Sequence, residues 1–196
     1  SEYCLFYYER GRMGDWVVLD NGAAEEGALH PDMLRRAVEA IRPSETVVPD
    51  VVNDTDATIE LTKKYASDFK SWPTLLMIVP QGRTLKDWRR CLYYQLTFIR
   101  AGAIGISKYC PIPRTTLLGS LAEDVPELPV HLLGIAVHPR EVVDLVGRVR
   151  GVDTAAPVAW GLKQHYLEEA HEHIGLDWNA PSAAPTAGRR AGGGAG

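Results

Sequence analysis

Polar side chains that can do chemistry recur at the ends of short apolar runs in this sequence. They are Asp20, Asn21 and Gly22 after the first run, Asp50 after the second, Gln81 and Gly82 after the third, Ser107 and Lys108 after the fourth, His138 after the fifth and Asp153 in the sixth. If these runs are strands of a parallel sheet, their carboxyl ends lie at one edge, where ligands of α/β proteins bind. The pattern therefore predicts one site that combines carboxylates, a carboxamide, a lysine and a histidine.

Such a set suits a nitrogen heterocycle attached to a sugar. Asp and Gln side chains match the donor and acceptor edges of a purine-like base, and a further carboxylate can attack or stabilise the anomeric carbon as its bond to nitrogen breaks. Clustered carboxylates also push their pKa values apart, so that one serves as an acid while another stays ionised. We assign the catalytic roles to Asp20, Asp50 and Asp153.

Other interpretations of the same residues stay open. Asp20 and Asp50 are also residue types that form caps and turns, and Gln81 could satisfy loop backbone. Lys108 at a strand end could form a Schiff base with a carbonyl substrate. The stretch 171–173 reads His-Glu-His, which differs from the His-Glu-x-x-His pattern of metal sites, and the sequence predicts neither a metal nor a cofactor.

The elements that must position these residues follow from apolar runs and helical periodicity. The runs predict strands over residues 16–20, 46–50, 74–81, 103–107, 131–136 and 152–160. Helical periodicity covers residues 3–12, 31–41, 54–65, 84–99, a segment that begins at 139, and 162–173. Pro31 in a first turn, Asp54 and Thr55 as caps, and Thr84 with Asp87 as a capping box mark three of the helix starts.

This alternation predicts an α/β fold with a parallel sheet of the (β/α) TIM-barrel type. About six strands are recognised, fewer than a closed barrel contains, so we expect a small or incomplete barrel that lacks a first strand. Its open sheet edge would need cover from a terminal helix or from a second subunit, which makes a homo-oligomer one expected arrangement. We expect residues 1–178 to form this single domain and the Ala, Gly, Pro and Ser-rich residues 179–196 to be disordered.

Composition restricts the class of protein. The 196 residues are 45% hydrophobic and 23% charged, as in a globular protein, and no apolar run predicts a membrane span or a secretory signal, so we expect a cytoplasmic protein. Three widely spaced cysteines, Cys4, Cys91 and Cys110, are expected to be reduced and buried. Four tryptophans are expected in the core: Trp16, Trp72, Trp88 and Trp160.

Charge is unevenly distributed. The formal net charge of -4 argues against a protein that coats nucleic acid through charge alone. From Arg83 to Arg114, however, the sequence contains seven basic residues and a single acidic residue, Asp87. This stretch is either a solvated helix face or a rim that contacts phosphates.

Six short motifs resemble a known family in their order and spacing. They are Leu-Asp-Asn-Gly-Ala (19–23), Val-Pro-Asp (48–50), Val-Pro-Gln-Gly (79–82), Ala-Ile-Gly-Ile (103–106), Leu-Leu-Gly (132–134) and Arg-Gly-Val-Asp (150–153). Over residues 16–160 the chain resembles the queuine and archaeosine tRNA-guanine transglycosylases, and still more their phage-borne relatives that insert 7-deazaguanines into DNA.

The resemblance implies a barrel enzyme that swaps or removes a base at its glycosidic bond. By motif match, Asp20 would be the acid/base aspartate, and Asp50, Gln81 and Gly105 would line the pocket that reads the base. Two features depart from the family: its nucleophilic aspartate corresponds to Ala156, which leaves Asp153 as the nearest carboxylate, and its structural zinc site is absent.

The leading hypothesis is therefore a transglycosylase-like enzyme acting on a purine or 7-deazapurine base. Its predicted partners are a free purine-like base and a nucleic acid, with DNA favoured over tRNA, or a nucleotide. The predicted substrate-binding residues are Asn21, Gly22, Gln81, Gly82, Gly105, Lys108, Gly134 and His138. The alternatives are a catalytically inactive sensor of a base or nucleotide on the same fold, and a lyase that uses Lys108.

Overall fold

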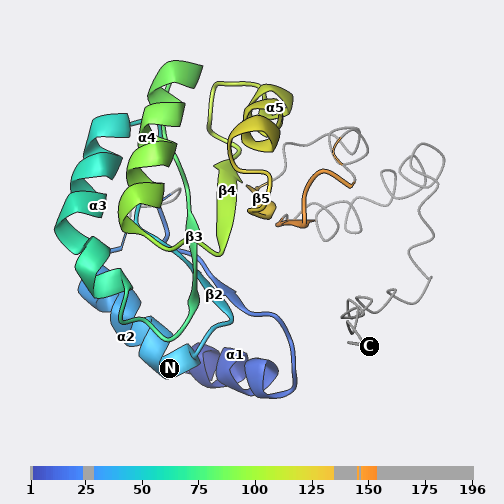
Figure 1. Cartoon of the computed structure of the whole chain (residues 1–196). Helices are drawn as coiled ribbons and strands as arrows, with labels where there is room; N and C mark the ends of the chain where they lie inside the picture. The colour runs from blue at the N-terminus through green and yellow to red at the C-terminus, as the bar shows by residue number, and fades with distance from the viewer. Residues whose placement is uncertain (1, 24–28, 135–144, 146, 154–196) are drawn as a thin grey trace, which may run out of the picture.

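The computed structural model describes residues 2–23, 29–134, 145 and 147–153. Within these residues five helices and six strands alternate along the chain (Figure 1). The helices are α1 (Glu2–Arg12), α2 (Pro31–Ile41), α3 (Thr55–Phe69), α4 (Leu85–Phe98) and α5 (Arg114–Asp124). The strands are β1 (Val18–Leu19), β2 (Glu45–Val47), β3 (Leu75–Ile78), β4 (Ala103–Ser107), β5 (Val130–Leu133) and β6 (Gly151–Val152).

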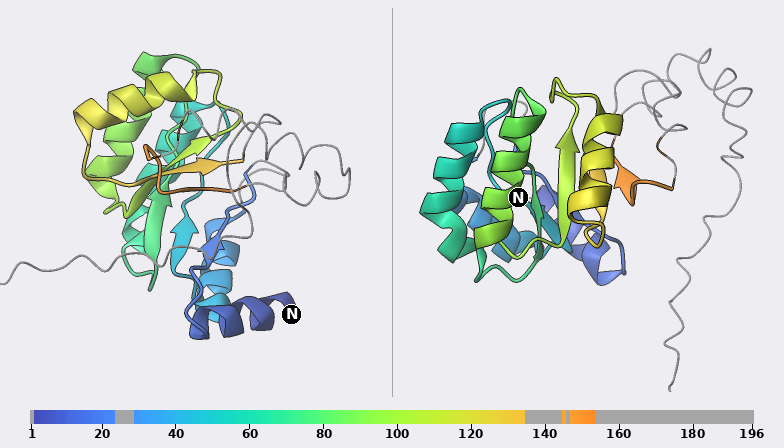
Figure 2. Two further views of the ribbon diagram at one scale, coloured as in Figure 1. Left: turned by 90° about the vertical axis from the view of Figure 1, so that its right-hand side faces the viewer. Right: turned by 45° about the horizontal axis from the view of Figure 1, so that its top comes forward.

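The six strands form one parallel sheet in chain order, β1 to β6. A doubly wound sheet reverses its strand order partway, whereas an unbroken order of parallel strands curls steadily in one direction, as in a TIM barrel. The result is a curled half-barrel, which confirms the predicted α/β fold of an incomplete TIM-like barrel. Figure 2 (right) shows α3, α4 and α5 following one another along the sheet.

Side chains alternate between the two faces of each strand. Ile104 and Ile106 of β4 point to the helices and are fully buried, while Ala103 and Gly105 point to the inside of the curl. The helix-covered side holds the larger core, which includes Leu34, Val38, Phe69, Ile78, Trp88, Leu92, Leu117 and Leu132. The inner side is a thin apolar layer of Val47, Met77, Val79 and Ala103. This inner layer forms the floor beneath the carboxyl ends of the strands.

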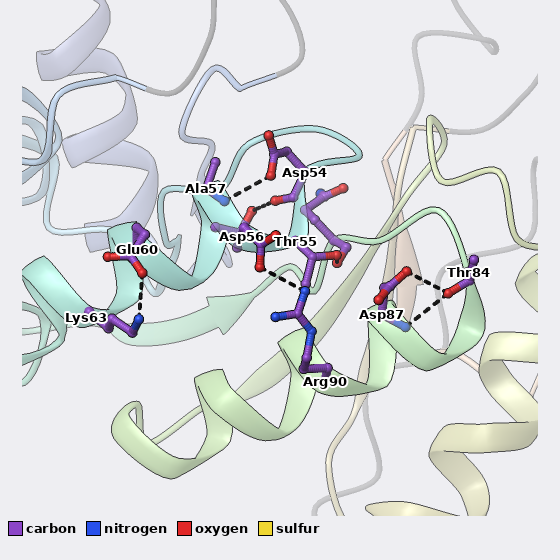
Figure 3. A network of polar contacts seen from close by, with 11 residues as sticks. Asp54, Thr55, Asp56, Ala57, Glu60, Lys63, Thr84, Asp87 and Arg90 are labelled. Atoms are coloured by element: carbon purple, nitrogen blue, oxygen red, sulfur yellow. Dashed lines mark hydrogen bonds and ion pairs between the residues drawn. The ribbon is translucent and has the colours of Figure 1, made fainter.

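Side-chain caps fix the starts of α3 and α4, as the sequence predicts. The Asp54 carboxylate accepts the Ala57 N–H at 2.9 Å, and the Thr84 hydroxyl accepts the Asp87 N–H at 3.2 Å while donating to the Asp87 carboxylate at 2.8 Å (Figure 3). Each cap satisfies a backbone donor that the helix leaves open. These caps lie at the end of the molecule where the predicted site residues gather.

Helix α5 was not among the predicted helices. Its first residue follows Pro113, and no side chain caps it, so the sequence lacks the usual start signal. Most strands are also shorter than their apolar runs; β3, for example, ends at Ile78 rather than at Gln81. Of the sixth predicted strand (152–160) only Val152 and Asp153 lie within the described residues, and β6 as observed spans Gly151–Val152. The segments predicted as helices from 139 and over 162–173 lie outside the described residues, as does the tail.

The predictions for single buried residues have mixed outcomes. Trp72 and Trp88 lie in the core. The prediction for Trp16 is wrong: this residue lies before the start of β1, and it is 60% exposed. No disulfide joins the three cysteines in the described part of the chain; Cys91 is buried, while Cys4 and Cys110 are only partly buried. Trp160 lies outside the described residues. Within the described part of the chain no helix is long and apolar enough to cross a bilayer.

Candidate functional site

A cavity of about 100 Å³ opens at the carboxyl ends of the strands. Its polar lining comes from the ends of β1, β2, β4 and β6 and consists of Asp20, Asn21, Asp50, Ser107, Lys108, Tyr109 and Asp153. Its apolar lining includes Val47, Val79 and Leu133 of the inner layer. Pockets that enclose drug-sized ligands measure roughly 300–1000 Å³, so this cavity suits a single small ring system rather than a larger molecule.

Asp50 is the most buried carboxylate of the cavity, with 3% of its surface exposed. The Asn21 amide donates to Asp50 Oδ1 at 2.6 Å, and the Gln81 amide donates to Asp50 Oδ2 at 2.6 Å. Asn21 also donates to the Val48 carbonyl at 2.7 Å, which ties the end of β1 to the segment after β2. Three neighbouring strands therefore supply one hydrogen-bonded unit, Asn21–Asp50–Gln81.

The surroundings of Asp50 favour its neutral form. Burial raises the pKa of this carboxyl to about 6; the hydrogen bonds from Asn21 and Gln81 oppose the rise, and the nearby Asp20 carboxylate adds to it. Within the described residues no cation is among the groups that influence Asp50. A carboxyl with this pKa changes charge close to neutral pH, which is a property of acid/base groups in active sites.

Asp20 lies at the mouth of the cavity and is exposed. Its carboxylate accepts the Gly22 N–H at 3.2 Å, so the chain turns immediately after β1. Gly22 has a φ of 72°, a backbone conformation that favours glycine. The turn directs Asp20 towards the cavity and Asn21 inwards to Asp50.

Asp153 follows β6 and lines the opposite side of the cavity. It accepts the Gly134 N–H at 2.9 Å and lies 3.5 Å from His131 Nε2. Burial raises the pKa of this carboxyl, but the contacts with His131 and Gly134 outweigh burial and hold its pKa below the ordinary value. The pKa values of Asp50 and Asp153 are thus displaced in opposite directions.

Lys108 reaches the cavity from the end of β4. Its ammonium lies 5.0 Å from the centre of the Tyr109 ring. Gly134 packs against the stem of the lysine: a Cβ at this glycine would lie 2.6 Å from Lys108 Cδ, and the glycine has a φ of 65°. Gly134 therefore leaves room for Lys108 beside Asp153.

Four of the predicted substrate-binding residues in the described part of the chain do not line the cavity: Gly22, which forms the turn after β1, and Gln81, Gly82 and Gly105. Gln81 is buried beside Asp50, and a Cβ on Gly82 would lie 2.4 Å from the Trp88 backbone nitrogen, so this glycine allows close packing of α4. Gly105 lies in the inner layer, where a Cβ would lie 2.8 Å from Leu133 Cδ1. His138, and with it Ala156, lies outside the described residues.

The sequence interpretation missed two residues of the site, His131 and Tyr109. His131 lies inside β5, two residues before Leu133, and therefore shares its inward face. The sequence pattern marks polar residues at the ends of strands, and His131 lies within a strand. Applying the same alternation to β5 could have identified it.

The basic stretch between Arg83 and Arg114, predicted as a solvated helix face or a rim that contacts phosphates, contains both paired and exposed cations in the structure. Arg90 pairs with Asp56 at 2.8 Å between α4 and α3 (Figure 3), and Arg89 pairs with Asp124 of α5. Arg83 and Lys86 are exposed at the start of α4, beyond Gln81. The two paired arginines therefore tie helices together, and the two exposed cations lie at the same end of the sheet as the cavity.

Within the described residues no group of three or more His, Cys, Asp or Glu side chains is arranged to hold a metal ion. Comparison with known proteins adds no relative: no family model matches the chain, and no curated protein matches it.

Proposed function

We propose that this protein breaks or exchanges the N-glycosidic bond of a purine or 7-deazapurine base in nucleic acid or in a nucleotide. The observation that carries the proposal is that Asp20, Asp50 and Asp153, which are far apart in the chain, line one cavity at the carboxyl ends of the strands. The size of the cavity suits one base, and the order of the sequence motifs resembles the tRNA-guanine transglycosylases.

In the proposed reaction each carboxylate has a separate role. Asp50 faces the base and accepts hydrogen bonds from its N–H groups. An ionised Asp153 stabilises or attacks the anomeric carbon, and the electron pair of the breaking bond goes to the base nitrogen. Asp20 supplies the proton that the departing base takes up, and the reverse sequence with a second base or with water completes exchange or hydrolysis.

The lowered pKa of Asp153 supports its role as the ionised carboxylate, and Asp50, whose pKa is raised to about 6, is ionised above that pH and can then accept hydrogen bonds from the base. Two carboxyl groups in one site can take different roles when their environments separate their pKa values. Asp153 then stays ionised over the pH range in which Asp50 takes up a proton. DNA is the favoured polymer because the motifs resemble the phage-borne relatives more closely, which would place the reaction in the host cytoplasm.

The test measures release of base and exchange of labelled guanine or 7-deazaguanine on DNA, tRNA and free nucleotides. We expect Asp20→Asn and Asp153→Asn each to lower turnover on the order of a hundredfold to ten-thousandfold. Asp68→Asn is the matched control, because Asp68 is exposed near the carboxyl end of α3, away from the cavity. Turnover that neither site variant lowers would refute the proposal, and base binding without turnover would favour a sensor.

A second candidate function is a lyase that forms a Schiff base. Its support is that Lys108 lines the same cavity beside Asp153. Borohydride reduction in the presence of a carbonyl substrate would then attach the substrate to Lys108, and Lys108→Met would abolish the labelling. Absence of labelling over a panel of aldehydes and ketones would exclude this candidate.

A further inference from the structure

Gln81 is held in a way that does not suit direct contact with a base. Its side chain is 1% exposed and is not part of the cavity lining. The amide nitrogen donates to Asp50, and the amide oxygen accepts the Asn53 N–H at 2.8 Å. Both polar ends of Gln81 are therefore engaged within the protein.

Asn21 is held in a similar way. Its amide oxygen accepts the Ala23 N–H at 2.7 Å, and its amide nitrogen is shared between Asp50 and the Val48 carbonyl. The side chain is 1% exposed, although it borders the cavity. The two amides thus reach Asp50 from opposite sides, and each donates to a different oxygen.

We infer that Asn21 and Gln81 are positioning residues that act through Asp50, keeping this buried carboxyl ionised and in one orientation, and do not themselves read the base. We call the two amides of Asn21 and Gln81 that hold Asp50 the clamp. Its effect on catalysis rests on the proposed function, but the clamp itself is a property of the protein without substrate. The inference assigns Gln81 a different role from the base-reading role that the family resemblance implies.

The charges around Asp50 explain why two neutral amides matter. Asp20, at the end of β1, raises the pKa of Asp50, and the buried Cys91 thiol of α4 lies close enough to interact with it. Lys108 and Asp153 line the same cavity from β4 and β6. Among the described groups that shift the pKa of Asp50, the two amide donors are the ones that lower it.

Removing one donor has a defined consequence. A hydrogen bond to a charged acceptor contributes enough to change proton affinity by about tenfold to hundredfold, which corresponds to about one to two pH units. In Asn21→Leu and Gln81→Leu the titration midpoint of Asp50 therefore moves upwards by that amount. The midpoint then lies at about 7 to 8, so about half to about nine tenths of Asp50 is neutral at pH 7.

The test follows the aspartate carboxyl carbons of isotope-labelled protein by NMR from about pH 4 to about pH 8. Asp50→Asn identifies the resonance of Asp50 by its disappearance. The control is Gln95→Leu, since Gln95 is a fully buried glutamine of α4 whose amide atoms have no hydrogen-bond partner in the described part of the chain. We expect the midpoint to rise in Asn21→Leu and Gln81→Leu and to stay in place in Gln95→Leu; an unchanged midpoint in the two clamp variants would overturn the inference.

A measurement on the unaltered protein covers the case in which the variants do not fold. The side-chain amide resonances of Asn21 and Gln81 must shift with pH at the midpoint of Asp50, because both amides donate to the titrating oxygens. Amide resonances that do not follow Asp50 would also overturn the inference. Neither measurement needs turnover, so the clamp can be confirmed even if no substrate reacts. If the proposed function is also correct, the acid limb of the pH profile of the exchange rate moves with the titration midpoint of Asp50.

Discussion

Strand β2 has a buried carboxylate at each end, and the two are stabilised differently. Glu45, at the start of β2, is fully buried and forms an ion pair with Arg150, which directly precedes β6. Asp50, beyond the end of β2, is also buried but is held by the neutral amides of Asn21 and Gln81. The same chemical group therefore meets a cation at one end of the strand and hydrogen-bond donors at the other.

The difference separates a structural use of a carboxylate from a chemical one. The ion pair of Glu45 with Arg150 joins the start of β2 to the residue before β6 across the inside of the curl, 105 residues apart in the chain. Amide donors leave Asp50 able to gain and lose a proton near neutral pH. Asp50 lies at the carboxyl ends of the strands, where the cavity opens.

The largest effect should come from breaking the pair at the structural end. Arg150→Met leaves the buried Glu45 carboxylate without its cation, and removing one partner of a buried pair costs about 3–4 kcal/mol. We expect a loss of that size in the free energy of unfolding, measured with urea. The matched control is Arg12→Met, which breaks an exposed pair with Glu9 on α1 and should cost less than about 1 kcal/mol.

A double variant separates charge from packing. Glu45→Leu combined with Arg150→Met removes both charges, and apolar replacements of buried pairs recover most of the lost stability. If Arg150→Met costs no more than Arg12→Met, the contrast between the two ends of β2 is not supported.

The sequence predicted the cavity end of the molecule better than the opposite end. Carboxyl ends of parallel strands share one edge, so the order of strands is enough to bring Asp20, Asp50 and Asp153 together. The pairing of Glu45 with Arg150 depends on how far the sheet curls, which no local pattern encodes. Long-range contacts that depend on the curvature of the sheet therefore cannot be predicted from local sequence patterns.

Within the cavity, the type of residue was predicted more reliably than its position. Gln81 was expected to line the pocket, but the backbone beyond β3 places it beside Asp50 and outside the cavity lining. His131 was missed because it lies within β5, and α5 was missed because Pro113 gives no side-chain cap. Each error concerns a feature set by packing or by the path of a loop.

The raised pKa of Asp50 makes the stability of the protein depend on pH. The folded pKa of about 6 exceeds the ordinary value of 3.8, so the folded protein binds more protons between these values than the unfolded chain does. This contribution to stability is fully present below the lower value and is lost as the pH rises through about 6. We expect Asp50→Asn, which cannot titrate, to gain about 2–3 kcal/mol relative to the unaltered protein between about pH 4 and about pH 7.

Urea unfolding at a series of pH values checks this expectation. The difference between the two proteins should change mainly between pH 3.8 and about 6, where Asp50 loses its proton. The exposed Asp68→Asn serves as the control and should show little change over the same range. Parallel pH profiles for Asp50→Asn and the unaltered protein would mean that burial does not influence this carboxyl as described.

The smallest effects come from two buried glutamines that differ only in their partners. Gln81 has both amide ends engaged, and Gln81→Leu should lower the free energy of unfolding by about 2 kcal/mol, because it leaves the Asn53 N–H and one Asp50 oxygen unsatisfied. Gln95 has neither end engaged within the described residues, and Gln95→Leu should raise that free energy by about 1 kcal/mol, because an apolar side chain of similar size replaces a desolvated amide. Urea unfolding of both variants at one pH should give opposite signs. Equal losses would show that the volume of a glutamine, rather than its hydrogen bonds, determines stability at both positions, and the clamp on Asp50 would then contribute nothing to stability.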